Sequence, residues 1–436
     1  MVVNKNSTTP NLVVSDGDGK LFEIPELMMT GMAINYLVVP DPVDIIALPD
    51  GSDLFSLPVR KPIGYDPASA EFIQLDEYGG REVFAAAAFM APAYVQLYRS
   101  AYTADPHTVK LPLYAYTAIG WQNHNFCVAG IRIDADPRQD HRGFNSKLIE
   151  KCAHQMAARY PKNRLIQHLM ENCVHRYGCP AARNLALGRW ECPVPTSPSC
   201  NADCVGCISK QPGKSGVCAS QDRLQFIPTI DEIVDFTVPH LENAEGAIIS
   251  FGQGCEGEPL MVSELLEAAI KAIRRQTPKG IINLNTNASL PIWIERLFIA
   301  GLDSIRVSMN SARAYYYQCY HQPKNYCFDD VLESLQIARR LNRWSSLNYF
   351  IFPGFTDHRE EVAALEKMLA ETRVNMIQAR NLNMDPEWYI DVMNLSQLST
   401  DFIGIRNWIK RIRKKFPEMI IGYFNPPAEK IHSLAK

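Results

Sequence analysis

Residues 200–207 read Cys200-Asn-Ala-Asp-Cys204-Val-Gly-Cys207, which places three cysteines at positions i, i+4 and i+7. Two residues between cysteines is a turn spacing that lets both thiolates reach one metal centre, and the remaining sulfur lies one helical turn away. Three thiolates are enough for a cubane iron–sulfur cluster and leave its fourth iron without a protein ligand. Because an open metal position distinguishes a catalytic centre from a closed structural one, this loop indicates a catalytic metal site.

A zinc knuckle is the alternative for the same three cysteines, because different metals share short cysteine spacings. A closed zinc site needs a fourth ligand from elsewhere in the chain. The cysteines available for it are Cys173, Cys179, Cys192 and Cys218. The loop alone leaves both interpretations open, and the sequence after the loop favours the cluster.

The composition is that of an ordinary globular protein of two or three domains. The chain has 436 residues, of which 47% are hydrophobic and 21% charged. Its formal net charge of -3 gives no argument for or against a nucleic-acid partner.

Two observations lead us to expect a cytoplasmic protein that does not cross a membrane. The longest uncharged stretch, Leu111 to Ile131, contains Gln122-Asn123-His124-Asn125 in its middle, which predicts two strands and a turn instead of a membrane span. Residues 1–7 lack the basic start and apolar run of a signal peptide. Twelve cysteines without an export signal then indicate a reducing compartment.

Residues 1–145 consist of short apolar runs separated by turn signals such as Asp16-Gly17 and Gly79-Gly80. This pattern predicts a β-rich accessory domain. Examples of the runs are Tyr36–Val39, Asp44–Leu48 and Leu111–Thr117, and the alanine-rich run Phe84–Val95 is expected to be a buried segment. The role of this region stays open between recruiting a substrate and covering the rest of the protein.

Residues 146–189 form a predicted helical linker, because apolar residues recur there at helical spacing. Cys173 and Cys179 lie near its end, with His154, His168 and His175 close in sequence. These residue types are compatible with a second metal site that holds an auxiliary cluster. The stronger interpretation is that the cysteines are buried as small hydrophobic side chains.

A regular alternation of strands and amphipathic helices follows the cysteine loop. Short apolar runs predict strands at residues 246–250, 281–285, 304–308, 347–352 and 375–380. One further strand before the loop gives six βα units. Strands that alternate with amphipathic helices imply a parallel sheet with right-handed crossovers.

Polar segments stand at the ends of these strands. They are Gly257-Glu258-Pro259, Asn285-Thr286-Asn287, the stretch from Arg306 to Ser311, Pro353-Gly354 and the stretch from Gln378 to Asn383. Each segment taken singly is also an ordinary helix entry or capped loop. Five of them in order behind a three-cysteine loop form a pattern with a functional meaning.

This pattern resembles the radical S-adenosylmethionine (SAM) superfamily over residues 190 to 385. Gly257-Glu258-Pro259 is similar to the Gly-Gly-Glu-Pro segment of the superfamily, whose exposed backbone meets the ammonium of SAM. Thr286-Asn287 is similar to a Thr-Asn pair common at that position, and Pro353-Gly354 to a turn that faces adenine. Gly206 departs from the pattern, because the superfamily usually carries an aromatic residue there.

The resemblance implies an α/β fold with a partial (β/α)6 TIM-like barrel over residues 190–395, followed by a basic amphipathic helix and tail at 396–436. It implies a [4Fe-4S] cluster on Cys200, Cys204 and Cys207, with SAM on the free iron. The polar strand ends fit the carboxylate and ribose of SAM by hydrogen bonding. The residues expected to contact SAM are Gly257, Glu258, Thr286, Asn287, Arg306, Ser308, Asn310, Pro353, Gly354, Gln378 and Arg380.

The activity that the resemblance implies begins with electron transfer from flavodoxin or ferredoxin to the cluster. Reductive cleavage of SAM then gives a 5′-deoxyadenosyl radical, which abstracts hydrogen from the substrate. The substrate stays open among a small molecule, a peptide and an RNA. The alternative is a non-catalytic iron–sulfur or zinc protein, which binding of SAM would distinguish from an enzyme.

Three further features have two interpretations each. Cys255 and Cys319 are either hydrogen donors to a substrate radical or, as is more common, structural. The segment Tyr315–His321 is either a substrate lid or, as we expect, a packed aromatic segment. The apolar stripe of residues 402–416 predicts a helix packed on the barrel with a solvated basic face, and RNA or acidic-peptide binding is the alternative. Its basic residues are Arg406, Lys410, Arg411, Arg413, Lys414 and Lys415.

Overall fold

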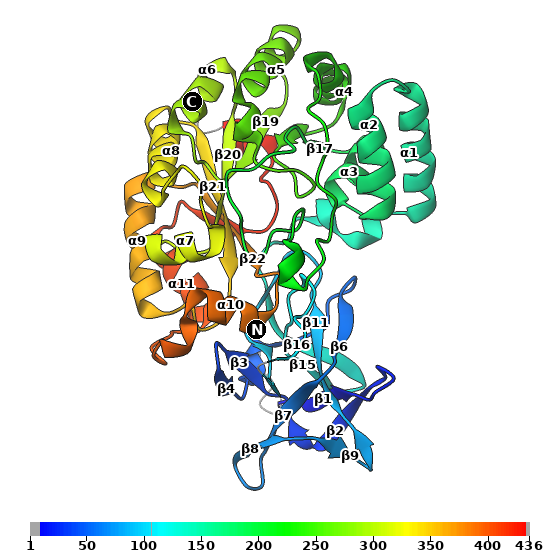
Figure 1. Ribbon diagram of the computed structural model, residues 1–436, viewed down its shortest axis with the longest axis vertical. Coiled ribbons are helices and arrows are strands. Elements are labelled where there is room, and N and C mark those ends of the chain that lie inside the picture. The colour runs from blue at the N-terminus through cyan, green and yellow to red at the C-terminus, as the bar shows by residue number, and fades with distance from the viewer. Residues whose placement is uncertain (1–8, 106, 433–436) are drawn as a thin grey trace.

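The computed structural model describes residues 9–105 and 107–432. A β-rich N-terminal part lies at one end of the molecule and an α/β part at the other (Figure 1). Residues 1–7, which bear on the expectation about an export signal, lie outside the described residues. Within the described chain, no helix combines the length and apolar character needed to span a bilayer.

The N-terminal part is built from antiparallel strands, as its turn-rich sequence predicts. In the large sheet, β1 (Asn11–Ser15) pairs with three strands, which are β2 (Leu21–Met28), β11 (Phe84–Phe89) and β15 (Ile119–Gln122). The same sheet contains β5 (Ile45–Ala47), β6 (Asp53–Leu57), β7 (Arg60–Asp66), β8 (Glu71–Gln74), β12 (Tyr94–Gln96), β14 (Tyr102–Ala104) and β16 (Asn125–Arg132). Two smaller sheets join β3 (Gly31–Ala33), β4 (Tyr36–Val38) and β13 (Arg99–Ser100), and β9 (Glu77–Tyr78) with β10 (Arg81–Glu82).

The long uncharged stretch forms the predicted hairpin. Strands β15 and β16 pair in antiparallel register, and Asn123 and His124 form the turn with φ angles of 51° and 62°. The prediction was wrong for the run Leu111–Thr117, which contributes a loop with isolated bridges at Thr117 and no strand. Pro112 offers no backbone donor, and the N–H of Leu111 is used by the carboxylate of Asp385.

The region expected to be a linker is helical and lies beside one edge of the α/β part (Figure 1). It contains α1 (Ser146–Arg159), α2 (Arg164–His168), the π-helix η4 (Leu169–Arg176) and α3 (Pro180–Ala186). The side chain of Asn145 caps α1 and that of Asn163 caps α2 by accepting backbone N–H groups. The π-helix has no counterpart in the sequence prediction.

The α/β part is a parallel sheet whose strands are hydrogen-bonded in chain order, and helices cover its outer face (Figure 1). The six predicted strands are all present, as β17 (Glu191–Val194), β18 (Ile248–Phe251), β19 (Ile281–Thr286), β20 (Ser304–Met309), β21 (Trp344–Ile351) and β22 (Met376–Asn381). The covering helices are α4 (Ile230–Asn243), α5 (Ser263–Gln276), α6 (Pro291–Ala300), α7 (Ala314–His321), α8 (Phe328–Arg340), α9 (Arg359–Thr372), α10 (Pro386–Met393) and α11 (Ile405–Lys415). This arrangement confirms the predicted α/β class with a partial barrel.

The C-terminal segment adds a seventh strand that the sequence did not predict. Strand β23 (Ile420–Gly422) pairs in parallel with β22, and α12 (Ala428–His432) follows it. The apolar stripe of α11 packs inward, with Ile405, Trp408, Ile409 and Ile412 buried. Arg406 pairs with Asp44, and Arg411 and Lys415 both pair with Glu366. The basic face of this helix is therefore partly neutralised by the protein itself.

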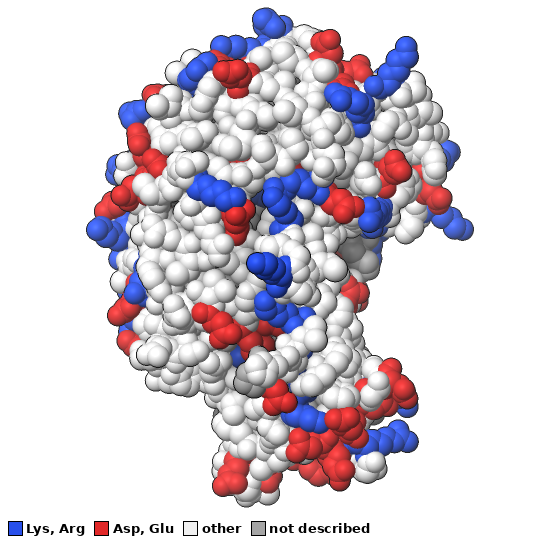
Figure 2. All heavy atoms as spheres, viewed as in Figure 1, with Lys and Arg blue, Asp and Glu red and all other residues white. Residues whose placement is uncertain are grey.

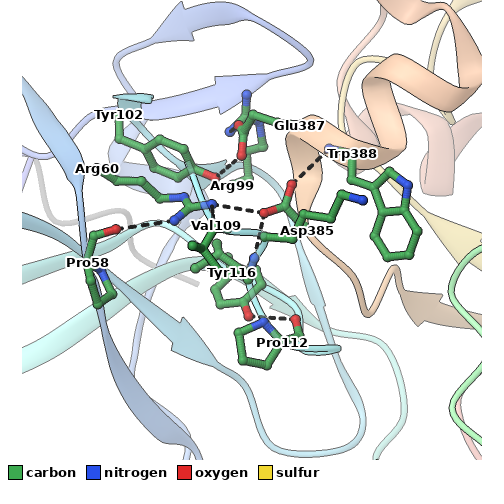
Figure 3. Close-up of polar contacts among 12 residues, drawn as sticks. Pro58, Arg60, Arg99, Tyr102, Val109, Pro112, Tyr116, Asp385, Glu387 and Trp388 are labelled. Carbon is green, nitrogen blue, oxygen red and sulfur yellow. Dashed lines mark hydrogen bonds and ion pairs between the residues drawn. The ribbon is translucent and has the colours of Figure 1, made fainter. Parts of the chain in front are cut away.

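One buried and one partly exposed ion pair join the N-terminal part to the barrel (Figure 3). Arg60 and Asp385 lie 3.0 Å apart, and their side chains are only 3% and 2% exposed. Arg99 pairs with Glu387 at 3.0 Å, and Tyr102 donates to the same carboxylate at 2.7 Å. Because Asp385 and Glu387 follow β22, the N-terminal part covers the C-terminal ends of the last barrel strands, where chemistry occurs in such barrels.

Candidate metal centre

The cysteine loop follows β17 and is fixed to two neighbouring elements. The N–H of Val205 donates to the carbonyl of Tyr320 at 3.0 Å, which attaches the loop to α7. On the other side, the N–H groups of Gly257 and Glu258 donate to the carbonyls of Ser197 and Ser199 at 2.7 and 2.8 Å. The loop therefore sits across the C-terminal end of the barrel, as the sequence predicts.

The thiols of this loop have polar groups close to their sulfur atoms. The Sγ of Cys204 lies 3.4 Å from Nδ1 of His321, and the guanidinium of Arg223 donates to Sγ of Cys207 at 3.4 Å. Burial raises the pKa of Cys200 to about 11 and that of Cys204 well above its usual value. Bound iron would displace these protons, and hydrogen-bond donors near the sulfurs would stabilise the thiolates.

The three sulfurs of the loop are not gathered as a single zinc ion would hold them. Tetrahedral zinc with Zn–S bonds of about 2.3 Å brings its sulfur ligands to about 3.8 Å from one another. Among the described residues, only His168, Cys173 and Cys255 gather three such ligand atoms within 4.8 Å of one another.

The cysteines considered as a fourth zinc ligand also lie in unsuitable places. Cys192 is fully buried in the hydrophobic core, and Cys218 is exposed. Cys173 faces Cys255, with the two sulfurs 3.6 Å apart.

The carboxylate of Glu258 joins the second and third strand ends. It accepts from the hydroxyl of Thr286 at 2.5 Å and from the N–H of Asn287 at 2.8 Å. Burial raises the pKa of Glu258 to about 7. The structure thus brings the predicted site residues Glu258, Thr286 and Asn287 together. The side chain of Glu258 holds the two strand ends to each other by hydrogen bonds.

Glu256 is a second carboxylate that connects two segments by hydrogen bonds, and the sequence analysis did not predict it. Its carboxylate accepts from the N–H groups of Thr196, Ser197 and Gln253 at 2.6 to 2.8 Å. It therefore fixes the chain before the cysteine loop to the loop after β18. Nothing in one sequence distinguishes Glu256 from Glu258, because both stand beside Gly257.

Gly257 is required by a close backbone approach, although the partner differs from the expected one. A Cβ at this residue would lie 2.0 Å from the carbonyl oxygen of Ser199 and 2.5 Å from its carbon. Any side chain would therefore push the cysteine loop away from the strand end. The expected backbone contact of Gly257 with SAM remains a prediction.

A polar group occupies the interior of the barrel. Arg306 donates to the side-chain oxygen of Gln378 at 3.0 Å, and Arg380 donates to the same oxygen at 3.4 Å. Burial and then the charge of Arg380 lower the pKa of Arg306 to about 10. Because Ser308 is two residues beyond Arg306 on β20, it shares this face. Two positive charges close together are suited to an anionic ligand.

Three other predicted site residues face protein groups. The amide of Asn310 is fully buried and donates to the carbonyl of Tyr316 at 3.1 Å. The carbonyl of Pro353 accepts from the N–H of Ile34 at 2.9 Å, and a Cβ at Gly354 would meet Ile34 at 2.9 Å. The N-terminal part therefore covers the turn that was expected to face adenine, and SAM contacts at these residues stay predictions.

The aromatic segment 315–321 lies on α7 and is packed except at its first residue, Tyr315, which is exposed. Tyr316, Tyr317 and Tyr320 are all buried. A Cβ at Gly206 would lie 2.7 Å from the hydroxyl oxygen of Tyr320, so α7 supplies an aromatic ring beside the cysteine loop. Cys319 packs against the same aromatic cluster. Its proposed role as a hydrogen donor, and that of Cys255, remain predictions.

The fold and this loop define an α/β protein with three cysteines in one loop at the ends of its parallel strands. Residues 194–365 match the model of the radical SAM superfamily. This part of the chain is a radical SAM domain, and the protein is an enzyme that contains it; reductive cleavage of SAM to a 5′-deoxyadenosyl radical is the chemistry of such domains. The comparison with curated proteins gives no match.

Several solved structures are similar at low identity. Methylornithine synthase is 12% identical over 63% of this chain and 75% of that one, with a TM-score of 0.37. The [FeFe]-hydrogenase maturase HydG from Carboxydothermus hydrogenoformans is 14% identical over 66% of this chain and 72% of that one, with a TM-score of 0.39. A mutant of spore photoproduct lyase is 15% identical over 54% of this chain and 77% of that one, with a TM-score of 0.37.

Proposed function

We propose that Cys200, Cys204 and Cys207 hold a [4Fe-4S] cluster whose fourth iron binds SAM, and that the barrel interior binds the reacting molecules. When bound, these groups supply the radical chemistry of the superfamily. The observation that supports this proposal best is the position of the three thiols across the C-terminal end of the barrel, with Arg223 and His321 at their sulfurs. The donors favour the thiolate form that iron requires.

The interior group of Arg306, Gln378 and Arg380 is proposed to bind an acidic group of SAM or of the substrate. Two guanidinium groups share one amide oxygen there, so a carboxylate would gain charge-assisted hydrogen bonds from both. Titration of the reconstituted enzyme with SAM distinguishes the two ligands. Weaker binding of SAM to Arg380→Gln assigns the group to SAM. Unchanged binding of SAM with lower substrate turnover assigns it to the substrate.

The N-terminal part is proposed to act as a cover for the site. Ile34 lies against the Pro353 turn, and the Arg60–Asp385 pair closes the neighbouring strand end. Exclusion of water from a radical site prevents side reactions. All twelve cysteines are free, which fits a reducing cytoplasm.

The electron donor is proposed to be an acidic carrier such as flavodoxin or ferredoxin. Lys210 and Lys214 are exposed on the segment that follows the cluster cysteines. Figure 2 shows Lys and Arg side chains over the middle of the face on which this segment lies in Figure 1. Positive charge near the centre would steer an acidic partner toward it.

The test is anaerobic reconstitution with iron and sulfide, followed by dithionite, SAM and an assay for 5′-deoxyadenosine. Formation of 5′-deoxyadenosine that is lost in Cys204→Ala supports the proposal. Cys152→Ala is a matched control, because Cys152 is a free cysteine on α1 outside the cysteine loop. Equal loss in both variants, or a reconstituted protein with zinc and no SAM binding, would contradict it.

A further inference from the structure

A second group of metal-binding side chains lies at the junction of the helical linker and the barrel. The nitrogen of His168 and the sulfurs of Cys173 and Cys255 all lie within 4.8 Å of one another. Cys173 and Cys255 are buried, and both are free thiols. This group shares no residue with the cysteine loop. It also differs from the auxiliary set expected from the sequence, since of the three histidines considered there only His168 takes part.

The distances fit a single tetrahedral ion. The sulfurs of Cys173 and Cys255 are 3.6 Å apart. Tetrahedral zinc with Zn–S bonds of about 2.3 Å places two sulfur ligands about 3.8 Å apart. A disulfide would require about 2.0 Å between the sulfurs. The pair is therefore spaced for a shared ion and not for a covalent bond.

The π-helix explains how His168 and Cys173 come together. In an α-helix, residues five apart point in directions that differ by about 140°. In η4 the backbone bonds to the fifth residue, as in the bond from the N–H of Tyr177 to the carbonyl of Asn172. This winding brings residues five apart to one side of the helix. Such π-helical turns are rare and occur frequently at functional sites.

His168 has one ring nitrogen without a protein partner. Its Nε2 is buried and has no hydrogen-bond partner in the described structure. The side-chain amide nitrogen of Asn172 lies 3.2 Å from Nδ1 and donates to it, so the neutral ring carries its proton on Nε2. A metal at Nε2 requires the Asn172 amide to turn so that its oxygen accepts from Nδ1–H. That is the hydrogen bond that orients most metal-binding histidines.

Cys179 lies on the same stretch of chain as Cys173, because its N–H donates to the carbonyl of Cys173 at 2.7 Å. Its thiol is outside the group of ligand atoms that lie within 4.8 Å of one another. The fourth position of a tetrahedral ion is therefore open to a water molecule, or to Cys179 after its side chain changes rotamer.

We propose that His168, Cys173 and Cys255 bind one Zn²⁺ ion that ties the helical linker to the loop after β18, with its fourth ligand from water or from Cys179 after a change of rotamer. Binding releases the thiol protons to solvent and changes no oxidation state. Cys255 immediately precedes Glu256, whose carboxylate holds Thr196 and Ser197 before the cysteine loop. The ion would thus fix the support of the iron–sulfur centre without belonging to it.

The test uses a background in which Cys200, Cys204 and Cys207 are all replaced by Ala, so that the proposed cluster contributes no metal. We expect this protein, purified with zinc in the medium, to contain about one zinc per chain, as a four-ligand site predicts. Cys173→Ser and Cys255→Ser should each lose most of the zinc. Cys152→Ser is the control, because its half-buried thiol lies on α1 outside the group.

A second measurement guards against variants that fail to fold. Cobalt added to the zinc-free background protein should give thiolate-to-cobalt charge-transfer absorption, and added zinc should abolish it. A background protein with wild-type circular dichroism that binds neither metal would overturn the proposal. So would zinc that persists in both serine variants, or a mass lower by two hydrogens that maps to a Cys173–Cys255 disulfide. Because the background cannot form the proposed cluster, these outcomes leave the radical chemistry untouched.

Discussion

At residue 206 the cysteine loop lies against an aromatic side chain from another element. A Cβ there would come within 2.7 Å of the hydroxyl oxygen of Tyr320 and 3.3 Å of the sulfur of Met384. Tyr320 is buried on α7, so its ring has little freedom to move away. The glycine that departs from the superfamily pattern is therefore required by an aromatic ring that reaches the same place from α7.

We predict that Gly206→Ala destabilises the protein by about 1–3 kcal/mol and lowers its iron content, because the added methyl group overpacks the loop. Adding Tyr320→Phe to this variant should restore much of the stability and of the iron content, since it removes the hydroxyl oxygen that the added methyl group would contact. Thermal unfolding and iron per chain after reconstitution measure the two effects. Gly213→Ala is the control, because a Cβ at Gly213 meets nothing within 4 Å. An equally impaired double variant would show that the contact is not the cause.

At the scale of elements, the start of α4 joins the helical linker to the barrel. Glu232 and Thr229 form a capping box, and the same carboxylate accepts from Nε of Arg164 at 2.7 Å. The hydrogen bond from Arg164 is the largest of the causes that lower the pKa of Glu232 from 4.5 to about 2. A depressed folded-state pKa gives stability that is complete above pH 4.5 and lost as the pH falls toward 2.

Glu232→Gln should therefore lower the free energy of unfolding at neutral pH by about 1 kcal/mol, since Arg164 is partly exposed and screened. The difference from the wild type should shrink as the pH falls below 4.5. Urea unfolding at a series of pH values measures it. Glu264→Gln, an exposed carboxylate in the first turn of α5, should show neither effect. A loss that is the same at every pH would refute the electrostatic explanation.

The sequence predicts those helices and strands whose residues follow a recognisable pattern of polar and apolar positions. The run 246–250 became strand β18, because strands covered on both faces are continuously apolar, and the alternating run 304–308 became β20. Strand β23 has only three residues, too few for a recognisable pattern. The π-helix was missed because its winding depends on tertiary contacts and not on residue type.

Some residues of the candidate site can likewise be predicted from the sequence, and the roles of others cannot. Cys200, Cys204 and Cys207 are recognisable because ligand spacing is local in sequence. The contacts of Glu256 with Thr196 and the covering of Gly354 by Ile34 join segments distant in sequence, and only the folded chain shows them. Long-range contacts of this kind have no local signal, so residue roles at strand ends need the structure.

At the scale of the whole molecule, the buried ion pair of Arg60 and Asp385 holds the N-terminal part to the barrel. Arg60 also donates to the carbonyl of Val109 at 3.1 Å, and Asp385 also accepts the N–H of Trp388 at 2.8 Å (Figure 3). Both members of the pair thus make further hydrogen bonds, although Nε of Arg60 has no partner among the described residues. Removal of one member leaves the other charge buried and uncompensated.

Asp385→Asn should therefore lower the free energy of unfolding by about 3–5 kcal/mol, as the loss of one member of a buried pair does. Arg60→Met combined with Asp385→Asn should cost less than the sum of the single changes, because no charge remains. The control is Glu82→Gln, which breaks the exposed pair with Lys61 on the same strand as Arg60 and should cost less than about 1 kcal/mol. Urea unfolding measures all four variants, and equal costs for Asp385→Asn and Glu82→Gln would contradict the prediction.

The charge distribution over the face of the cysteine loop bears on how electrons arrive. Lys210 and Lys214 are exposed three and seven residues after Cys207, whereas Lys147 and Lys151 are exposed on α1 at the edge of the molecule (Figure 1). Both pairs contribute equally to net charge. Only the first pair is placed to orient an acidic carrier toward the metal centre.

Replacing Lys210 and Lys214 together by Glu should slow cluster reduction by reduced flavodoxin several-fold at low salt, because oriented encounter is lost. The difference should diminish as salt rises and the Debye length falls to about 8 Å at 0.15 M. Stopped-flow measurement of cluster reduction follows the rate, and 5′-deoxyadenosine formed with excess dithionite should stay at the wild-type level. Replacing Lys147 and Lys151 by Glu makes the same change in net charge elsewhere and should leave the rate unchanged. Equal slowing by both double variants would mean that net charge, and not a docking surface beside the cysteine loop, governs electron delivery.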